Sequence, residues 1–189
     1  MNSEEINRMP AFILNNGGII RSVNIILYDP LKGYLFTTEK RKSFPDIGIR
    51  PILTHLIGGK VDMKDKIPFE TGLREFCEEL PYTLNGYNIN ETVHLILGVF
   101  ETCTKRYKDI LVSKSKNLYN RFYIINISEI VDTEIKLSLY SRIENWSKLP
   151  ESALESLFFW KSGMELKIKS TPLLESFILE LPNEKYNKK

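Results

Sequence analysis

Three glutamates, at positions 75, 78 and 79, follow Pro68 in a segment with helical periodicity. An α-helix turns by about 100° per residue, so these carboxylates lie within about 100° of arc on one side of the predicted helix. Like charges this close repel one another unless a cation lies among them. Because Mg²⁺ prefers oxygen ligands, the spacing predicts a magnesium-type site and favours phosphate chemistry. The opposite side of the helix is apolar and includes Phe69, Leu73, Phe76 and Leu80.

The neighbouring residues support this interpretation. Gly58 and Gly59 are expected to form a turn before the helix that leaves main-chain carbonyls free, and the Gly59 carbonyl could join the shell of a metal ion. Arg74 lies four residues before Glu78 and can fix the orientation of that carboxylate. The alternative is an amphipathic helix with a solvated acidic face. The glycines and the arginine favour the metal site.

The segment that contains Arg74-Glu75-Phe76-Cys77-Glu78-Glu79 resembles the signature of the Nudix hydrolases, and the resemblance covers residues 58–82. It implies an α/β fold, an α/β/α sandwich with a mixed β-sheet. It also implies an enzyme that uses Mg²⁺ or Mn²⁺ to cleave the diphosphate linkage of a nucleoside diphosphate derivative. Members of this family often form homodimers.

The resemblance also implies roles for particular residues. Arg74 would hold the glutamates in place, and Glu78 is the first candidate for the group that activates water. Two glutamates outside the signature, Glu101 and Glu134, are further candidates for the base. The implied metal ligands are the carbonyl of Gly59 and the carboxylates of Glu75, Glu78 and Glu79.

The segment departs from the family pattern at three places. Asp65 takes the place of an early glutamate, and one extra residue lies between Gly59 and Pro68. Pro81 stands where a glycine usually follows the helix, and proline cannot take a positive φ. These departures leave open a catalytically inactive module that binds nucleotides or proteins. Removal of the cap from mRNA is a third interpretation, but a net charge of +2 gives no support for the basic groove that RNA requires.

The residues that could recognise substrate are less specific. Lys40 and Arg41, which lie beside Lys42, could neutralise phosphates, and Phe44 could stack against a base. The alternatives are a solvated basic turn and an aromatic side chain in the core. Tyr123 and Trp160 are open to the same two interpretations, and His55 is expected to pack rather than to bind a metal.

Composition limits the class of protein. The 189 residues fit one domain, expected over residues 18–182, between a lead-in at 1–17 and a tail at 183–189. The two cysteines do not suffice for a disulfide framework or a four-ligand zinc site. The polar first residues lack a secretory signal, and no apolar run reaches the roughly 20 residues that span a bilayer. We therefore expect an intracellular, cytoplasmic protein without membrane contact, with a nuclear location equally compatible.

The expected elements would place the acidic helix beside a sheet. Helices are predicted over residues 68–80, from a Ser128 cap to about 147, and from Pro172 onward. Residues 39–51 are predicted to form a surface loop, and residues 154–160 are compatible with a strand or a helix. Strands are predicted at residues 19–28, 34–38, 52–57, 92–102 and 118–127.

Overall fold

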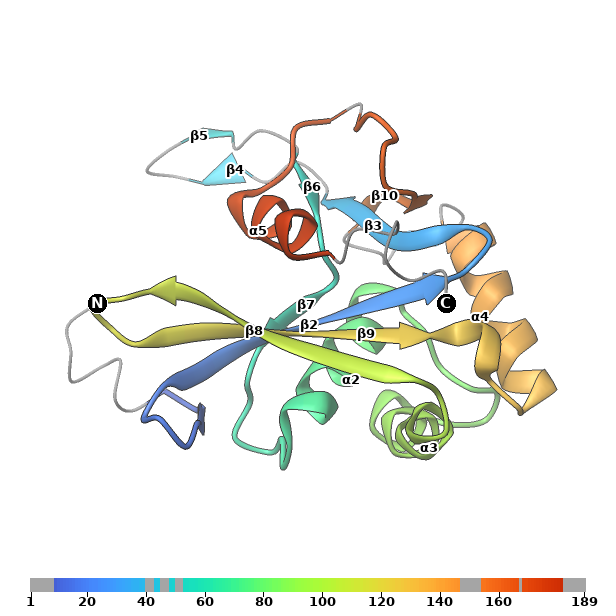
Figure 1. Ribbon diagram of the computed structural model, residues 1–189. Coiled ribbons are helices and arrows are strands. Elements are labelled where there is room, and N and C mark those ends of the chain that lie inside the picture. The colour runs from blue at the N-terminus through green and yellow to red at the C-terminus, as the bar shows by residue number, and fades with distance from the viewer. Residues whose placement is uncertain are drawn as a thin grey trace, which may run out of the picture.

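The computed structural model describes residues 9–39, 43–44, 48–49, 53–146, 154–166 and 168–181. These residues form a mixed α/β structure in which a curled, mixed sheet packs against four helices (Figure 1). The expected C-terminal tail and residues 1–8 of the expected lead-in lie outside the described residues. Within the described ranges, no helix combines the length and the apolar character that a membrane crossing requires.

The sheet is built around β2 (Ile19–Asp29), whose run of β-branched and other apolar residues suits a buried central strand. The main strand order is β10-β3-β2-β9-β8, and only the β2–β9 pair is parallel along this path. The short strands β1 and β7 also pair with β2, and β6 pairs with β3. The bounds are β1 (Phe12–Ile13), β3 (Gly33–Glu39), β6 (Thr54–His55), β7 (Gly58–Lys60), β8 (Lys105–Ser113), β9 (Leu118–Asn126) and β10 (Leu154–Trp160). A separate small sheet joins β4 (Ser43–Phe44) to β5 (Gly48–Ile49).

Helices pack against both faces of this sheet, because successive side chains of a strand point to opposite sides. In β2, Val23, Ile25 and Leu27 share one core with α2 (Pro68–Glu79), α3 (Ile89–Glu101) and α4 (Thr133–Asn145). Ile26 belongs to a second core with α5 (Pro172–Glu180). Figure 1 shows α2 and α3 on the opposite side of the sheet from α5. The alternation in β2 therefore places the acidic helix on one defined face.

Several predicted elements are confirmed. Strands occupy the predicted positions near 19–28, 34–38 and 118–127, and residues 154–160 form a strand. The helix predicted at 68–80 is α2, and the last helix begins at Pro172 with Thr171 as its N-cap.

Other predicted elements are wrong. Residues 92–102, predicted as a strand, form most of α3 because Asn88 and Glu91 make a reciprocal capping box at its start. The helix after β9 starts at Thr133 and is capped by Asp132, not by Ser128, which lies in a short 3₁₀ turn, Ile127–Glu129. Gly58 and Gly59 lie in β7 rather than in a turn. Strand β8 was not predicted.

The end of α2 carries an unusual proline. Pro81 has a φ of 24°, in the left-handed region that favours glycine, so the expectation that this proline excludes a positive φ is wrong. The amide of Tyr82 donates to the carbonyl of Cys77 at 2.9 Å, the longer hydrogen bond of a Schellman ending. The second bond of that motif would come from the amide of residue 81, which proline lacks. The helix thus ends in a glycine-type geometry without a glycine.

Replacing Pro81 with glycine is expected to stabilise the protein. Glycine adopts a positive φ without strain and supplies the missing amide, so Pro81→Gly should raise the free energy of unfolding by about 1–2 kcal/mol. Thermal unfolding measures the change as a higher Tm. Pro172→Gly is the control, because that proline stands at the first position of α5, where its fixed φ is favourable, and its loss should lower the Tm. An unchanged or lower Tm for Pro81→Gly would contradict the strained ending.

Candidate functional site

The segment between β7 and α2 folds back over the first turns of the helix. Asp65 accepts hydrogen bonds from the Asp62 amide at 2.8 Å and from the Thr71 hydroxyl at 2.9 Å. The Lys66 amide donates to Glu70 at 2.9 Å. These bonds hold the Asp65 carboxylate against α2.

Gly72 allows α2 to approach the sheet closely. A Cβ at this position would lie 2.5 Å from Cγ1 of Ile25, so a larger residue would push the helix away from β2. Helix interiors disfavour glycine by about 1 kcal/mol relative to alanine. Close packing against the side chain of Ile25 therefore explains a residue that is locally unfavourable.

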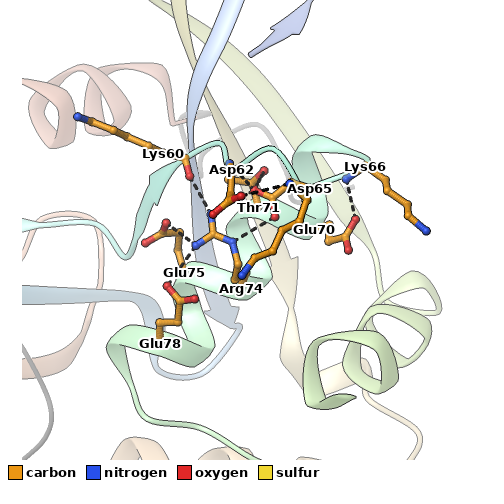
Figure 2. Close-up of polar contacts among 10 residues, drawn as sticks. Lys60, Asp62, Asp65, Lys66, Glu70, Thr71, Arg74, Glu75 and Glu78 are labelled. Atoms are coloured by element: carbon orange, nitrogen blue, oxygen red, sulfur yellow. Dashed lines mark hydrogen bonds and ion pairs between the residues drawn. The ribbon is translucent and has the colours of Figure 1, made fainter. Parts of the chain in front are cut away.

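Arg74 is the centre of the site (Figure 2). Its Nε and Nη2 atoms donate to the two oxygens of Asp65, each at 3.1 Å. Nη2 also donates to the Lys60 carbonyl at 2.8 Å. Nη1 donates to Glu75 at 2.8 Å and to Glu78 at 3.1 Å. Because a guanidinium has five N–H donors, these contacts use its full capacity and fix the positions of three carboxylates.

Burial makes these contacts electrostatically strong. The side chains of Arg74 and Asp65 are 7% and 2% exposed, whereas that of Glu78 is 42% exposed. Burial alone would lower the pKa of Arg74, but its bonds to Asp65 and Glu75 raise it. Burial alone would raise the pKa of Asp65, but hydrogen bonds from Arg74, the Asp62 amide and Thr71 hold it below its ordinary value. Asp65 and Arg74 are therefore a fixed ion pair.

Glu75 has the opposite electrostatic character. Burial raises its pKa above the ordinary value, and the charges of Glu78 and Asp65 raise it further, although Arg74 opposes them. The negative charge of Glu75 is therefore only partly compensated by the protein. A cation beside it would offset the remaining cost.

Gly59 provides the space for the Glu75 carboxylate. A Cβ on Gly59 would lie 2.2 Å from the carboxyl carbon of Glu75, so any side chain there would displace the carboxylate. Strand pairing places Gly59 opposite Val23. The Gly59 carbonyl accepts a hydrogen bond from the Ser22 hydroxyl at 3.1 Å, which corrects the expectation that this carbonyl is free.

The structure brings together most of the predicted signature residues. Glu75 and Glu78 face Arg74, and the side chains of Lys60 and Lys66 extend away from the guanidinium (Figure 2). Glu79 is half-buried at the last position of α2. The sequence did not predict that Lys60 and Ser22 take part, because their contacts come from the pairing of β7 with β2.

The candidates outside the signature are dispersed. Glu101 is exposed at the end of α3. Glu134 lines a groove with residues of α3 and the loop before it, and within the described ranges that groove includes no residue of α2. Lys40 and Arg41 lie outside the described residues, as does the side chain of Phe44, although its backbone forms part of β4.

The aromatic candidates belong to the interior. Tyr123 is 7% exposed and Trp160 is 5% exposed, each in one of the two hydrophobic cores. The core interpretation of both residues is therefore confirmed. His55, in β6, is half-buried.

The donor set is suitable for a hard divalent cation. Among the described side chains, no group of three or more histidine, cysteine, aspartate or glutamate residues is arranged as a preformed metal site. The helix and its loop nevertheless place three carboxylates around a single guanidinium, and the excess charge is negative. Oxygen ligands and negative charge are what Mg²⁺ requires. The carboxylates are those of Asp65, Glu75 and Glu78, and Glu79 follows Glu78 at the end of the helix.

Comparison of the chain with known protein-family models and with curated protein sequences finds no match. The geometry of the site therefore carries the functional argument.

Proposed function

We propose that this protein is a Mg²⁺-dependent hydrolase that cleaves the diphosphate linkage of a nucleoside diphosphate derivative, and that its fold is a Nudix-type α/β/α sandwich. The arrangement around Arg74 supports this proposal most strongly. The guanidinium joins Asp65, Glu75 and Glu78, and Gly59 leaves space for one of these carboxylates. A solvated acidic helix would not require a buried arginine whose N–H groups all donate hydrogen bonds. It would also not require a glycine at the position where the Glu75 carboxylate packs.

The residues divide into positioning and binding groups. Asp65 and the Lys60 carbonyl orient Arg74, which in turn orients Glu75 and Glu78. The residues that would hold Mg²⁺ are Glu75, Glu78, Glu79 and the Gly59 carbonyl. When bound, the ion supplies positive charge to the diphosphate oxygens and lowers the pKa of water. Glu78 is the proposed base, because it is the more exposed of the two glutamates that Arg74 contacts.

The proposal is tested by incubating the purified protein with Mg²⁺ and a panel of diphosphates. The panel contains ADP-ribose, dinucleotides, nucleotide sugars, oxidised deoxynucleoside triphosphates, diphosphoinositol phosphates and capped RNA. We expect release of a phosphorylated product from a small nucleotide derivative, and its loss when EDTA removes the metal. Product from capped RNA alone would instead favour the decapping interpretation.

Glu79→Gln provides the matched test of the carboxylates. It removes one charge from the proposed metal-binding group and should lower kcat/KM by at least about tenfold, or about 1.4 kcal/mol. Glu70→Gln is the control, because Glu70 lies in the first turn of the same helix and binds the Lys66 amide instead. Equal activity of the two variants would contradict the proposed site. Tight nucleotide binding without turnover would favour the inactive binding module.

A further inference from the structure

Two adjoining hollows lie along β2, and neither has a described lining residue from α2. The first, of about 510 Å³, lies between the start of α5 and strands β2, β8 and β9. The second, of about 330 Å³, lies beside β2 and β7. Arg21, Ser22 and Leu118 line both hollows, so the two form one continuous surface.

Two residues connect these hollows directly to the proposed catalytic group. Lys60 lines the second hollow, and its carbonyl accepts the 2.8 Å hydrogen bond from Arg74. Ser22 lines both hollows, and its hydroxyl donates to the Gly59 carbonyl.

The first hollow combines apolar walls with a buried amide. Ile110, Leu118 and Leu173 are among its lining residues. Asn120, from the central part of the sheet, is only 4% exposed, and its Oδ1 atom is buried without a hydrogen-bond partner. An unsatisfied buried oxygen is unfavourable, and rotation of the amide toward a donor in the hollow would remove this cost. Apolar walls with one well-placed polar group are typical of small-molecule sites.

The second hollow has a different character. Most of its lining is apolar, as in the first hollow, but three cationic residues, Arg21, Lys60 and Lys116, also line it. Cations in this position favour phosphate groups. The two hollows together thus match a ligand with a flat, hydrogen-bonding end and an anionic end.

We infer that these hollows form a nucleotide-binding site, with the base in the first hollow against Asn120 and the phosphates in the second hollow among Arg21, Lys60 and Lys116. The choice of a nucleotide as the ligand rests on the proposed function, whereas the binding site itself does not. The base is expected to present an N–H donor to the Asn120 amide oxygen. Affinity should therefore depend on the base as well as on the phosphate.

Binding measurements without metal test this inference separately from hydrolysis. Titration calorimetry would compare AMP, GMP, CMP and UMP with ribose 5-phosphate, which lacks a base. At least one nucleotide should bind about tenfold more tightly than ribose 5-phosphate. Asn120→Leu should remove this advantage, whereas Lys116→Ala should weaken the binding of nucleotide and ribose 5-phosphate alike.

Two further variants control the experiment. Asn85→Leu makes the same chemical change in the separate groove beside α3 and should leave binding unchanged. Ser176→Tyr places a larger side chain into the first hollow from α5 and should weaken nucleotide binding. This variant tests the site if Asn120→Leu does not fold. Nucleotides that bind no better than ribose 5-phosphate would overturn the inference, as would wild-type affinity in folded Asn120→Leu and Ser176→Tyr. Nucleotide binding that depends on Asn120, without any hydrolysis, would refute the proposed enzyme and keep the binding site.

Discussion

Asp65→Asn is expected to lower the free energy of unfolding by about 3 kcal/mol, a large part of the stability of a domain. The substitution keeps the size of the side chain but removes the charge opposite Arg74. Both side chains are almost fully buried, so water cannot replace the lost partner. We expect the lower end of the range for broken buried pairs, because Arg74 retains Glu75 and Glu78. Chemical denaturation measures the loss.

The pH dependence provides a second measurement of the same pair. Because the pKa of Asp65 is lowered by folding, its ionised form stabilises the protein above its unfolded pKa of about 3.9. This contribution is lost as the pH falls through the lower pKa of the folded state. Wild-type protein should therefore lose stability below about pH 4, and Asp65→Asn should lack this part of the transition.

Asp109→Asn is the matched control for the size of the effect. Asp109 accepts two hydrogen bonds from Arg121, at 2.7 and 2.8 Å, in the same paired geometry. Its side chain is 20% exposed, compared with 2% for Asp65, so solvent screens the pair more effectively. The control should lose about 1 kcal/mol or less. Equal losses in the two variants would show that burial of the Asp65 pair has no special importance.

The sequence was sufficient to predict the acidic helix because its signals are local. Pro68 fixes the first turn, and the apolar residues recur at helical spacing. The contact between Arg74 and Glu78 follows from a separation of four residues. By contrast, the bonds from Arg74 to Asp65 and to the Lys60 carbonyl depend on the path of an irregular loop, which no periodic pattern encodes.

The errors have equally specific causes. In residues 92–102 the partial alternation of Val93, Leu95, Leu97 and Val99 suggested a strand. The stronger signal was the capping box formed by Asn88 and Glu91, followed by buried residues at helical spacing. The buried positions are Thr92, Val93, Ile96 and Phe100.

The glycine pair was misinterpreted for a different reason. Gly58 and Gly59 suggested a turn, but both lie in a strand that pairs with β2. Glycine is required at position 59 because the Glu75 carboxylate occupies the space of a side chain. Such a tertiary contact cannot be read from the residues themselves. The contact nevertheless places Gly59 beside a glutamate of α2, as the expected turn would have done.

Glu75→Gln is expected to distinguish the role of Glu75 from that of Asp65, although Arg74 contacts both carboxylates. The raised pKa of Glu75 means that its ionised form becomes a cost to stability as the pH rises above about 4.5. Neutral glutamine avoids this cost and can still accept the bond from Arg74. At pH 7 and without metal, Glu75→Gln should therefore unfold at the same temperature as wild type or higher, opposite in sign to Asp65→Asn.

The same substitution should remove the response to Mg²⁺. Wild-type protein is expected to show a Tm that rises with Mg²⁺ concentration, because binding to the folded state stabilises it. Glu75→Gln should show little increase and a kcat/KM at least about a hundredfold lower, which corresponds to about 3 kcal/mol. Glu70→Gln should respond to Mg²⁺ like wild type, since Glu70 lies apart from the Arg74 group. If Glu75→Gln kept the full Mg²⁺ response, the raised pKa of Glu75 would reflect burial alone, and the metal would have to bind elsewhere.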